Sequence, residues 1–221
     1  MKDCFFVDNH ILAVAKDFNV NVETYTGDIK NELAKLGFKN TYIEPINPIS
    51  TEESGIIVFA LTSKAKERLD AQIVEGDFVA KHFAICVGTP KERNNTNNGY
   101  VHMGSKTGRL EYIPQLNSDA QKIYDRYSVL EQNSQISFVC IEGGLVHKDE
   151  IRFVMADAGS PIFGDKLYGG DSLAKGTNTA LSLVELKLIH PTTNKNLIFR
   201  YYPPIEKKPW SFFNVEKYLK I

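Results

Sequence analysis

The fold of this chain is indicated by the stretch NPISTEESGIIVFA, residues 47–60. Ser54-Gly55 introduces an apolar run, residues 56–60, rich in β-branched and aromatic side chains. A short apolar run behind a turn is typical of a buried strand. The loop before this strand is polar and consists of Ser50, Thr51, Glu52 and Glu53. Because polar loops at the end of buried strands often carry function, this loop is the first candidate site.

The segments on either side of this strand predict a mixture of strands and helices. Strand patterns cover residues 4–16, 77–88, 100–113, 120–144 and 181–204, and all but the third are strongly apolar. Helices are predicted over 26–37, 62–76 and 148–160, and the polar segment 89–99 is predicted to be a loop. The chain is therefore expected to be an α+β protein with a mixed, mostly antiparallel sheet, flanking helices and one continuous core.

Composition narrows the classes of function. The chain has 221 residues and a formal net charge of -1, which argues against binding nucleic acid by overall charge alone. The three cysteines, Cys4, Cys86 and Cys140, fit neither a zinc pattern nor a disulfide framework. No signal-peptide core or membrane-spanning run is present. We therefore expect a cytoplasmic protein that binds no membrane, no metal and no cofactor.

Five segments resemble one protein family, the RluA-type RNA pseudouridine synthases. They are ILAVAKDFNVNV, NPISTEESGIIVFALTSKA, VAKHFAICVG, VHKDEIRFVMADAGSPIFGDKLYGG and LKLIHPTTNKNLIF. In the first segment, Lys16 matches the family's Lys-Pro-Ala-Gly turn and Asp17-Phe18-Asn19 departs from it. The resemblance extends from about Ile11 to about Pro204 and implies the pseudouridine synthase fold, with a central cleft. It also implies the family reaction, the isomerisation of uridine to pseudouridine in ribosomal or transfer RNA. We expect one such domain over residues 1–221, without a separate N-terminal RNA-binding domain.

The departures from the family motifs fall on the chemistry. Aligned through Ser54-Gly55, the family's catalytic aspartate becomes Ser50 and its threonine becomes Glu53. The family's Lys-x-Tyr becomes residues 81–83, Lys-His-Phe. Its helix motif Gly-Arg-Thr-His-Gln-Ile-Arg becomes residues 146–152, in which Ile151 and Arg152 alone are retained. By contrast Gly164-Asp165, Leu167-Tyr168-Gly169 and His190-Pro191 match the family.

These departures predict impaired catalysis. A serine hydroxyl is neutral and is a poor nucleophile unless a base removes its proton, and no histidine lies near Ser50 in sequence. The chain is then a pseudoenzyme on the family scaffold. The alternative is an active synthase with a relocated carboxylate from Glu52 or Glu53, and a remote base such as His10 or His147 stays open. An unrelated hydrolase using Ser50 or Ser54 is a third interpretation, without a Gly-x-Ser-x-Gly motif to support it.

The resemblance also implies a substrate-binding set, which consists of Lys81, Phe83, Asp149, Arg152, Ser54 and Gly55. Phe83 supplies either an aromatic face for a flipped uracil or a core side chain on an alternating strand. In the family, the arginine at position 152 pairs with the catalytic aspartate. Because a buried guanidinium without a partner is costly, we expect Arg152 to pair with Asp149, Glu52 or Glu53.

The expected partner is RNA. The basic residues that could line a groove are Lys64, Lys66, Arg68, Lys81, Lys106, Arg109, Lys148 and Lys166. Asp149 and Glu150 add negative charge where the family is neutral or basic, so we expect weaker RNA binding than in active relatives. A protein partner is the other expectation. The sequence identifies neither the RNA nor the target uridine.

Overall fold

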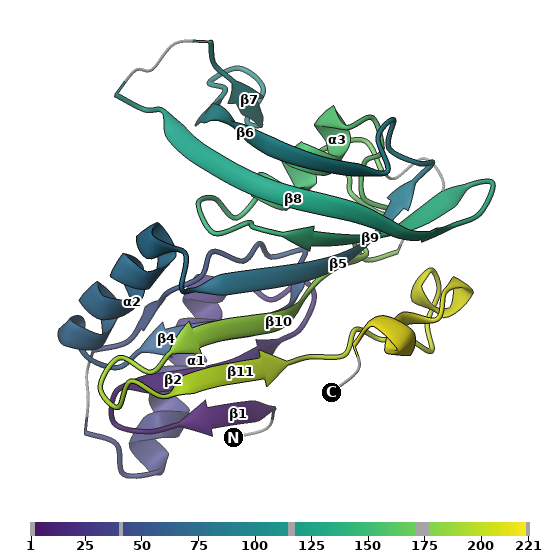
Figure 1. The fold of residues 1–221 in the computed structure, drawn as a ribbon. Coiled ribbons are helices and arrows are strands. Elements are labelled where there is room, and N and C mark those ends of the chain that lie inside the picture. The colour runs from purple at the N-terminus through teal and green to yellow at the C-terminus, as the bar shows by residue number, and fades with distance from the viewer. Residues whose placement is uncertain (1–2, 40–41, 115–117, 171–176, 220–221) are drawn as a thin grey trace.

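A computed structural model describes residues 3–39, 42–114, 118–170 and 177–219 (Figure 1). The helices are α1 (Val22–Lys35), α2 (Ser63–Glu75) and α3 (Glu150–Asp157), followed by two short 3-10 helices, Trp210–Phe212 and Val215–Tyr218. The strands are β1 (Cys4–Val7), β2 (Ile11–Lys16), β3 (Glu44–Pro45), β4 (Ser54–Ala60), β5 (Val79–Val87), β6 (Asn94–Met103), β7 (Leu110–Tyr112), β8 (Gln121–Gln132), β9 (Ile136–Glu142), β10 (Leu181–Ile189) and β11 (Asn196–Arg200).

One continuous sheet joins all the described strands. Its main order is β1-β2-β4-β10-β5-β9-β8-β6-β7, with β11 beside β10 and β3 beside β4. Neighbours are antiparallel except β4 and β10, which run parallel where Ser54 pairs with Ser182 and Gly55 with Leu183. The expected α+β fold, with a mostly antiparallel sheet and flanking helices, is therefore confirmed.

The apolar run of β4 is buried on both faces because a helix covers each one. Alternate residues of a strand point to opposite faces. Ile56 and Val58 pack in a cluster with Leu69 of α2. Ile57 and Phe59 pack with α1. Both helices lie beside this half of the sheet in Figure 1. The central strand thus has no solvated face, which explains why its sequence does not alternate.

Local signals set the helix ends. Asn21 accepts the backbone N–H groups of Glu23 and Thr24, so α1 begins well before residue 26. Thr62 caps α2, which ends at Gly76 with a φ of 84°. Leu36 does not share the buried face of α1. It follows the helix and is 57% exposed, because the chain turns at Gly37.

Segment 89–99 is not wholly a loop. Its second half begins β6, which pairs antiparallel with β8 from Asn94–Ser128 to Val101–Gln121. Exposed Asn and Thr side chains carry no strand pattern, yet the backbone groups of β6 find partners on β8. Tertiary pairing therefore overrides a weak local propensity here.

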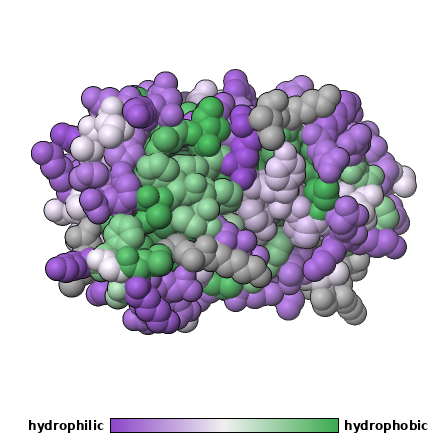
Figure 2. Space-filling view, turned by 90° about the horizontal axis from the view of Figure 1, so that it is seen from below, coloured by the Kyte–Doolittle hydropathy of each residue, from purple (hydrophilic) through white to green (hydrophobic). Residues whose placement is uncertain are grey.

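The described surface is mostly hydrophilic with apolar patches. Figure 2 views the molecule from below and shows apolar side chains gathered among hydrophilic ones. Phe5 and Val7 of β1 and Ile198 of β11 are exposed, and the rings of Phe5 and Phe199 lie 6.3 Å apart. No helix in the described ranges is long and apolar enough to cross a membrane.

Candidate functional site

The polar loop before β4 is fixed to the sheet by two side chains. Asn47 donates from Nδ2 to the carbonyl of Ile56 at 3.0 Å and accepts the N–H of Val58 at 2.9 Å. Lys16 is fully buried at the end of β2. Its Nζ donates to the carbonyl of Glu53 at 2.6 Å, and to three other carbonyls, of Asp17, Val20 and Thr51.

Burial and the neighbouring acidic side chains have opposite effects on the pKa of Lys16. Burial lowers the pKa of its ammonium to about 8, although the nearby charges of Glu53, Glu52 and Asp17 raise it. The ammonium joins the loop that follows β2 to the loop that precedes β4. Lys16, retained from the family motif, is therefore a positioning element for residues 50–53.

Ser50 is the buried first residue of this loop. It is 1% exposed, and its Oγ has no hydrogen-bond partner among the described residues. Ser54 is buried too, and its Oγ lies 2.6 Å from the Oγ of Ser182. Among the described residues, no histidine forms a hydrogen bond with either hydroxyl. The hydrolase interpretation, which needs such a base, therefore gains no support.

Arg152 is the centre of the site. Both carboxylate oxygens of Asp165 hold one edge of its guanidinium, with Nε to Oδ2 at 2.7 Å and Nη2 to Oδ1 at 2.8 Å. Its Nη1 lies 2.8 Å from Oδ1 of Asp149 and 3.3 Å from Oε2 of Glu52. The structure thus gives Arg152 the acid partners expected at Asp149 and Glu52, but not Glu53. Asp165 is the partner that sequence reasoning missed.

Charge and packing together fix this arginine. Burial alone would lower the pKa of Arg152, but its hydrogen bonds with Asp165 and the charges of Asp165, Asp149 and Glu52 outweigh burial and raise it. The guanidinium carbon lies 5.4 Å from the ring centre of Tyr168. Asp165 also accepts the N–H groups of Leu167 and Tyr168, so one carboxylate orders both the arginine and the Gly-Asp loop.

A pocket of about 500 Å³ opens beside Arg152. Its lining consists of Asn19, Glu52, Arg152, Gly164, Lys166, Leu167, Thr177, Asn178 and Thr179. We call it the Arg152 pocket. The side chain of Glu52 is 45% exposed and faces the pocket beside the guanidinium. Glu53 and Ser50 do not line it. Of the acids considered as a relocated carboxylate, Glu52 is the one with access to this cavity.

Glu53 instead turns into the core toward β5. Its Oε1 lies 3.2 Å from Nε2 of His82, and both side chains are almost fully buried. Alternation along β5 then directs Phe83 to the other face, where it packs against Phe138 at 4.9 Å. Phe83 is 1% exposed and packs in a core cluster, which favours the core alternative over stacking on a base.

Lys81 shares the face of Phe83. Its Nζ lies 3.4 Å from Oε1 of Glu185, which also pairs with Lys187 and Arg200. Lys81 therefore belongs to a charge cluster outside the Arg152 pocket. Gly55 likewise has a structural role. Its φ is 128°, and a Cβ there would lie 2.2 Å from the carbonyl oxygen of Leu183.

A buried pair of acids, Asp125 and Glu150, lies next to His82. Asp125 of β8 is fully buried and accepts the N–H of Gly144 at 2.8 Å. Burial, with the nearby charge of Glu150, raises its pKa to about 8. Burial likewise raises the pKa of Glu150, which accepts the N–H groups of Val146 and His147. These contacts anchor the start of α3, and hence Arg152, to the sheet.

The remote histidines do not serve Ser50. His10 precedes Ile11, which pairs with Ala60, whereas Gly55 pairs with Lys16 at the other end of the same two strands. His147 accepts the backbone N–H of Asp149 through Nδ1. Burial lowers the pKa of His147, with Asp149 acting against this shift.

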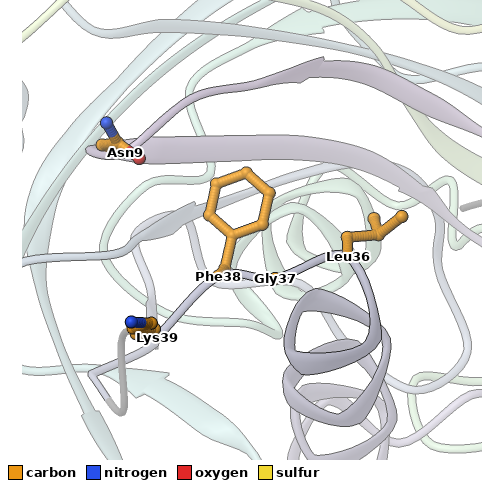
Figure 3. A pocket seen from close by; sticks show the side chains of 5 residues that line it. All are labelled: Asn9, Leu36, Gly37, Phe38 and Lys39. Atoms are coloured by element: carbon orange, nitrogen blue, oxygen red, sulfur yellow. The ribbon is translucent and has the colours of Figure 1, made fainter.

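A separate hollow of about 390 Å³ lies at the C-terminal end of α1 (Figure 3). Leu36, Gly37, Phe38 and Lys39 form one side and Asn9 the other. None of the candidate site residues lines it, so this hollow is separate from the candidate site.

Two features of the site had a signal in the sequence. Asp165 lies in a loop that keeps the family pattern while the motifs around it change. Retention of a charged residue in such a loop indicates that it has a role. The period of β5 also separates His82 from Phe83, although it does not say which of them faces the site. The Asp125–Glu150 pair had no signal, because nothing local relates β8 to α3.

The chain is similar in sequence to curated proteins described as RNA pseudouridine synthases. No protein-family model matches the chain. It is 26% identical to the Bacillus subtilis protein described as uncharacterized RNA pseudouridine synthase YhcT, over 93% of this chain and 70% of that protein. It is also 26% identical to the dual-specificity RNA pseudouridine synthase RluA of Haemophilus influenzae, over 89% of this chain and 91% of that protein.

The fold agrees with solved structures. Human RNA pseudouridylate synthase domain containing 4 superposes with a TM-score of 0.73 at 18% identity, covering 92% of this chain and 89% of that chain. Human RNA pseudouridylate synthase domain containing 1 gives a TM-score of 0.70, also at 18% identity, covering 92% and 84%. The chain therefore has the pseudouridine synthase fold and is a divergent relative of the RluA-type enzymes.

Proposed function

We propose that the protein is a pseudouridine synthase-like domain that binds RNA but has lost the family's isomerisation reaction. The observation that carries this proposal is Ser50, at the position of the family's aspartate. Its hydroxyl is buried, neutral and without a hydrogen-bond partner among the described residues. A hydroxyl with no base to deprotonate it cannot replace an ionised carboxylate in breaking a glycosidic bond.

The state of Arg152 supports the same conclusion. In the resembled family, this arginine orders the catalytic aspartate. Here both oxygens of Asp165 hold it, and Asp149 fills a further donor. Its charge is thus compensated by residues fixed in the core. This arrangement satisfies the arginine as a structural group and leaves it little freedom to organise a reacting acid.

Cations near the pocket support RNA contact. Lys166 lines the Arg152 pocket, and Lys148 is exposed just before α3. Exposed Arg109 lies 5.8 Å from the ring centre of Tyr168, the ring that Arg152 also faces. Lysine and arginine beside a cavity can contact phosphates of a bound strand. Glu52 and Asp149 oppose them, so we expect weak, salt-sensitive binding.

Glu52 favours a second candidate function. Its carboxylate lines the pocket and lies 3.3 Å from Nη1 of Arg152. In the resembled family, the arginine at this position pairs with the catalytic aspartate. In this alternative, Glu52 is a relocated catalytic acid and the protein is an active synthase. The position of Glu52, two residues further along the loop than Ser50, argues against this alternative. A displacement of about 1 Å can cost on the order of 100-fold in rate.

One assay separates these functions. Ribosomal and transfer RNA carrying tritium at carbon 5 of uridine are incubated with the protein, and release of tritium is followed beside filter binding of the same RNA. The Haemophilus influenzae RluA serves as the positive control. We expect RNA binding without release.

Release by the wild-type protein would contradict the proposal. If Glu52→Gln then lowered it by about 100-fold or more, while Glu53→Gln did not, the relocated acid would be established. Neither release nor binding would also contradict the proposal, and would leave a protein partner as the remaining expectation.

A further inference from the structure

A second cavity lies on the other side of the segment that walls the Arg152 pocket. Its volume is about 300 Å³, and its lining includes Phe18, Tyr201, Trp210, Lys207, Lys208 and Asn178. We call it the Trp210 pocket. Thr177, Asn178 and Thr179 line both cavities, so a single stretch of chain separates them. A ligand that entered both would therefore need recognition groups repeated along a chain.

The walls of the Trp210 pocket are held in place from several directions. Trp210 is 2% exposed and packs in the cluster that contains Phe83 and Phe138. The backbone N–H of Tyr201 donates to the carbonyl of Val184 at 2.8 Å. Asn19, next to Phe18, donates from Nδ2 to Oδ1 of Asn178 at 2.9 Å. The cavity is thus largely preformed.

Lys16 strengthens this preorganisation. Its buried ammonium binds the carbonyls of Asp17 and Val20, which lie on either side of Phe18 and Asn19. The same ammonium binds the loop before β4. One buried charge therefore fixes a wall of the Trp210 pocket and a wall of the Arg152 pocket relative to each other. Phe18 also stands where the family has its Pro-Ala-Gly turn, so this aromatic wall is a feature of this chain.

The chemistry of the lining fits a nucleotide better than a simple anion. Phe18 and Tyr201 are half-buried aromatic rings, against which a base can stack. Lys207 and Lys208 are exposed and carry charge suited to a phosphate. Asp17 also lines the cavity, which disfavours an isolated phosphate but can accept hydrogen bonds from a base or a ribose.

We propose that the Trp210 pocket holds a single-stranded nucleotide of the RNA whose neighbouring nucleotide occupies the Arg152 pocket. The base stacks on Phe18 and Tyr201, and its phosphate meets Lys207 and Lys208. This inference rests on the proposed RNA binding and adds the class of substrate to it. The recognised RNA is unpaired over at least these two nucleotides, because a base within a duplex presents no free face for stacking.

Trp210 provides a direct readout, because it is the chain's only tryptophan. A fluorescently labelled, uridine-rich single strand of about ten nucleotides is titrated against the full chain. Its anisotropy reports binding anywhere, and tryptophan fluorescence reports the proposed pocket. We expect the tryptophan signal to change and to saturate together with the anisotropy. A fully paired duplex of the same sequence is expected to bind at least about tenfold more weakly.

The variant test uses matched charges. Lys207→Ala combined with Lys208→Ala should weaken binding by about tenfold. Lys30→Ala combined with Lys35→Ala, at exposed positions on α1, removes the same charge and should change it less than about twofold. RNA binding with unchanged tryptophan fluorescence and equal effects of both double variants would overturn the inference and leave the proposed function standing. No RNA binding at all would overturn both.

Discussion

Arg152 shows how a buried guanidinium can be compensated by several acids at once. Desolvating a guanidinium costs several kcal/mol unless charges and hydrogen bonds replace water. Three carboxylates do so here, but they differ in value. Asp165 is fully buried and contacts the arginine through two nitrogens. Glu52 is half-exposed and contacts one nitrogen at 3.3 Å. The contribution of each acid to stability should follow its burial.

Asp165→Asn is therefore expected to be strongly destabilising. It removes the charge partner of a buried arginine and should lower the free energy of unfolding by at least about 2 kcal/mol. Glu52→Gln, at the same guanidinium but exposed to solvent, should cost less than about 1 kcal/mol. Urea unfolding of both variants measures the difference. Equal losses would mean that Asp165 is not the main partner of Arg152.

At the scale of secondary-structure elements, the junction of β4 and β10 brings the candidate loop into the middle of the sheet. The parallel pairing at Ser54–Ser182 and Gly55–Leu183 requires a very close approach of the two backbones. Gly55 permits it, because any Cβ at that position would overlap the carbonyl of Leu183. Gly55 is thus required for two reasons: its φ is in the region that favours glycine, and a side chain there would clash with β10.

Gly55→Ala should lower the free energy of unfolding by about 3 kcal/mol or more, through strain and lost pairing. Gly27→Ala is the matched control, since Gly27 lies within α1 with nothing within 4 Å of its Cβ direction. That variant should be more stable than the wild type by about 0.5–1 kcal/mol. Thermal unfolding of both decides this. A neutral Gly55→Ala would show that β4 and β10 can separate at little cost.

The contact between β8 and α3 should make stability depend on pH. Asp125 of β8 faces Glu150 of α3, with His82 of β5 beyond it and then Glu53 of the loop before β4. An acid whose pKa is raised from 3.8 to about 8 holds its proton more tightly in the folded state than in the unfolded chain. The free energy of unfolding should therefore fall as the pH rises from about 4 through about 8.

Asp125→Asn tests this dependence, since the amide imitates the protonated acid and can still accept the N–H of Gly144. We expect the stability advantage of the variant over the wild type to grow between pH 5 and pH 8 by about 1 kcal/mol or more, or about 2–4 °C in Tm. Calorimetry at both pH values provides the comparison. A constant difference between the two proteins would assign the effect to packing instead of titration.

At the scale of the whole molecule, one sheet runs through two sets of core clusters. Helices α1 and α2 cover the half that contains β4, and α3 covers the half that contains β5 and β8. Strand β10 belongs to both halves, because it pairs with β4, β5 and β11. We propose that residues 1–221 behave as one domain. The site lies where the halves meet, since Glu52 comes from one and Arg152 from the other.

This arrangement predicts one cooperative unfolding transition. Separating the halves would break the pairs between β10 and β5 and expose the buried contacts of Arg152, so neither half should unfold alone. Differential scanning calorimetry should give equal calorimetric and van't Hoff enthalpies. Two resolved transitions, with the calorimetric enthalpy clearly larger, would contradict a single domain.

The amino-acid sequence by itself determined the features that depend on neighbours along the chain. The apolar run after Ser54-Gly55, the caps at Thr62 and Gly76, and the hairpin turn after His190 are local, so periodicity and turn chemistry predicted them. The motifs spaced along the chain also predicted the fold. The start of β6 was missed, because its polar side chains carry no pattern and its pairing depends on β8.

Only the tertiary structure decided which side chains meet. Glu52 reaches Arg152 from 100 residues away, and Asp165 rather than Glu53 became the main partner of that arginine. Whether Phe83 or His82 faces the site depends on which face of β5 the helix α3 covers. The physical reason is that charge compensation and burial act through space. The sequence states which groups need a partner, and the packing of the elements assigns one to each.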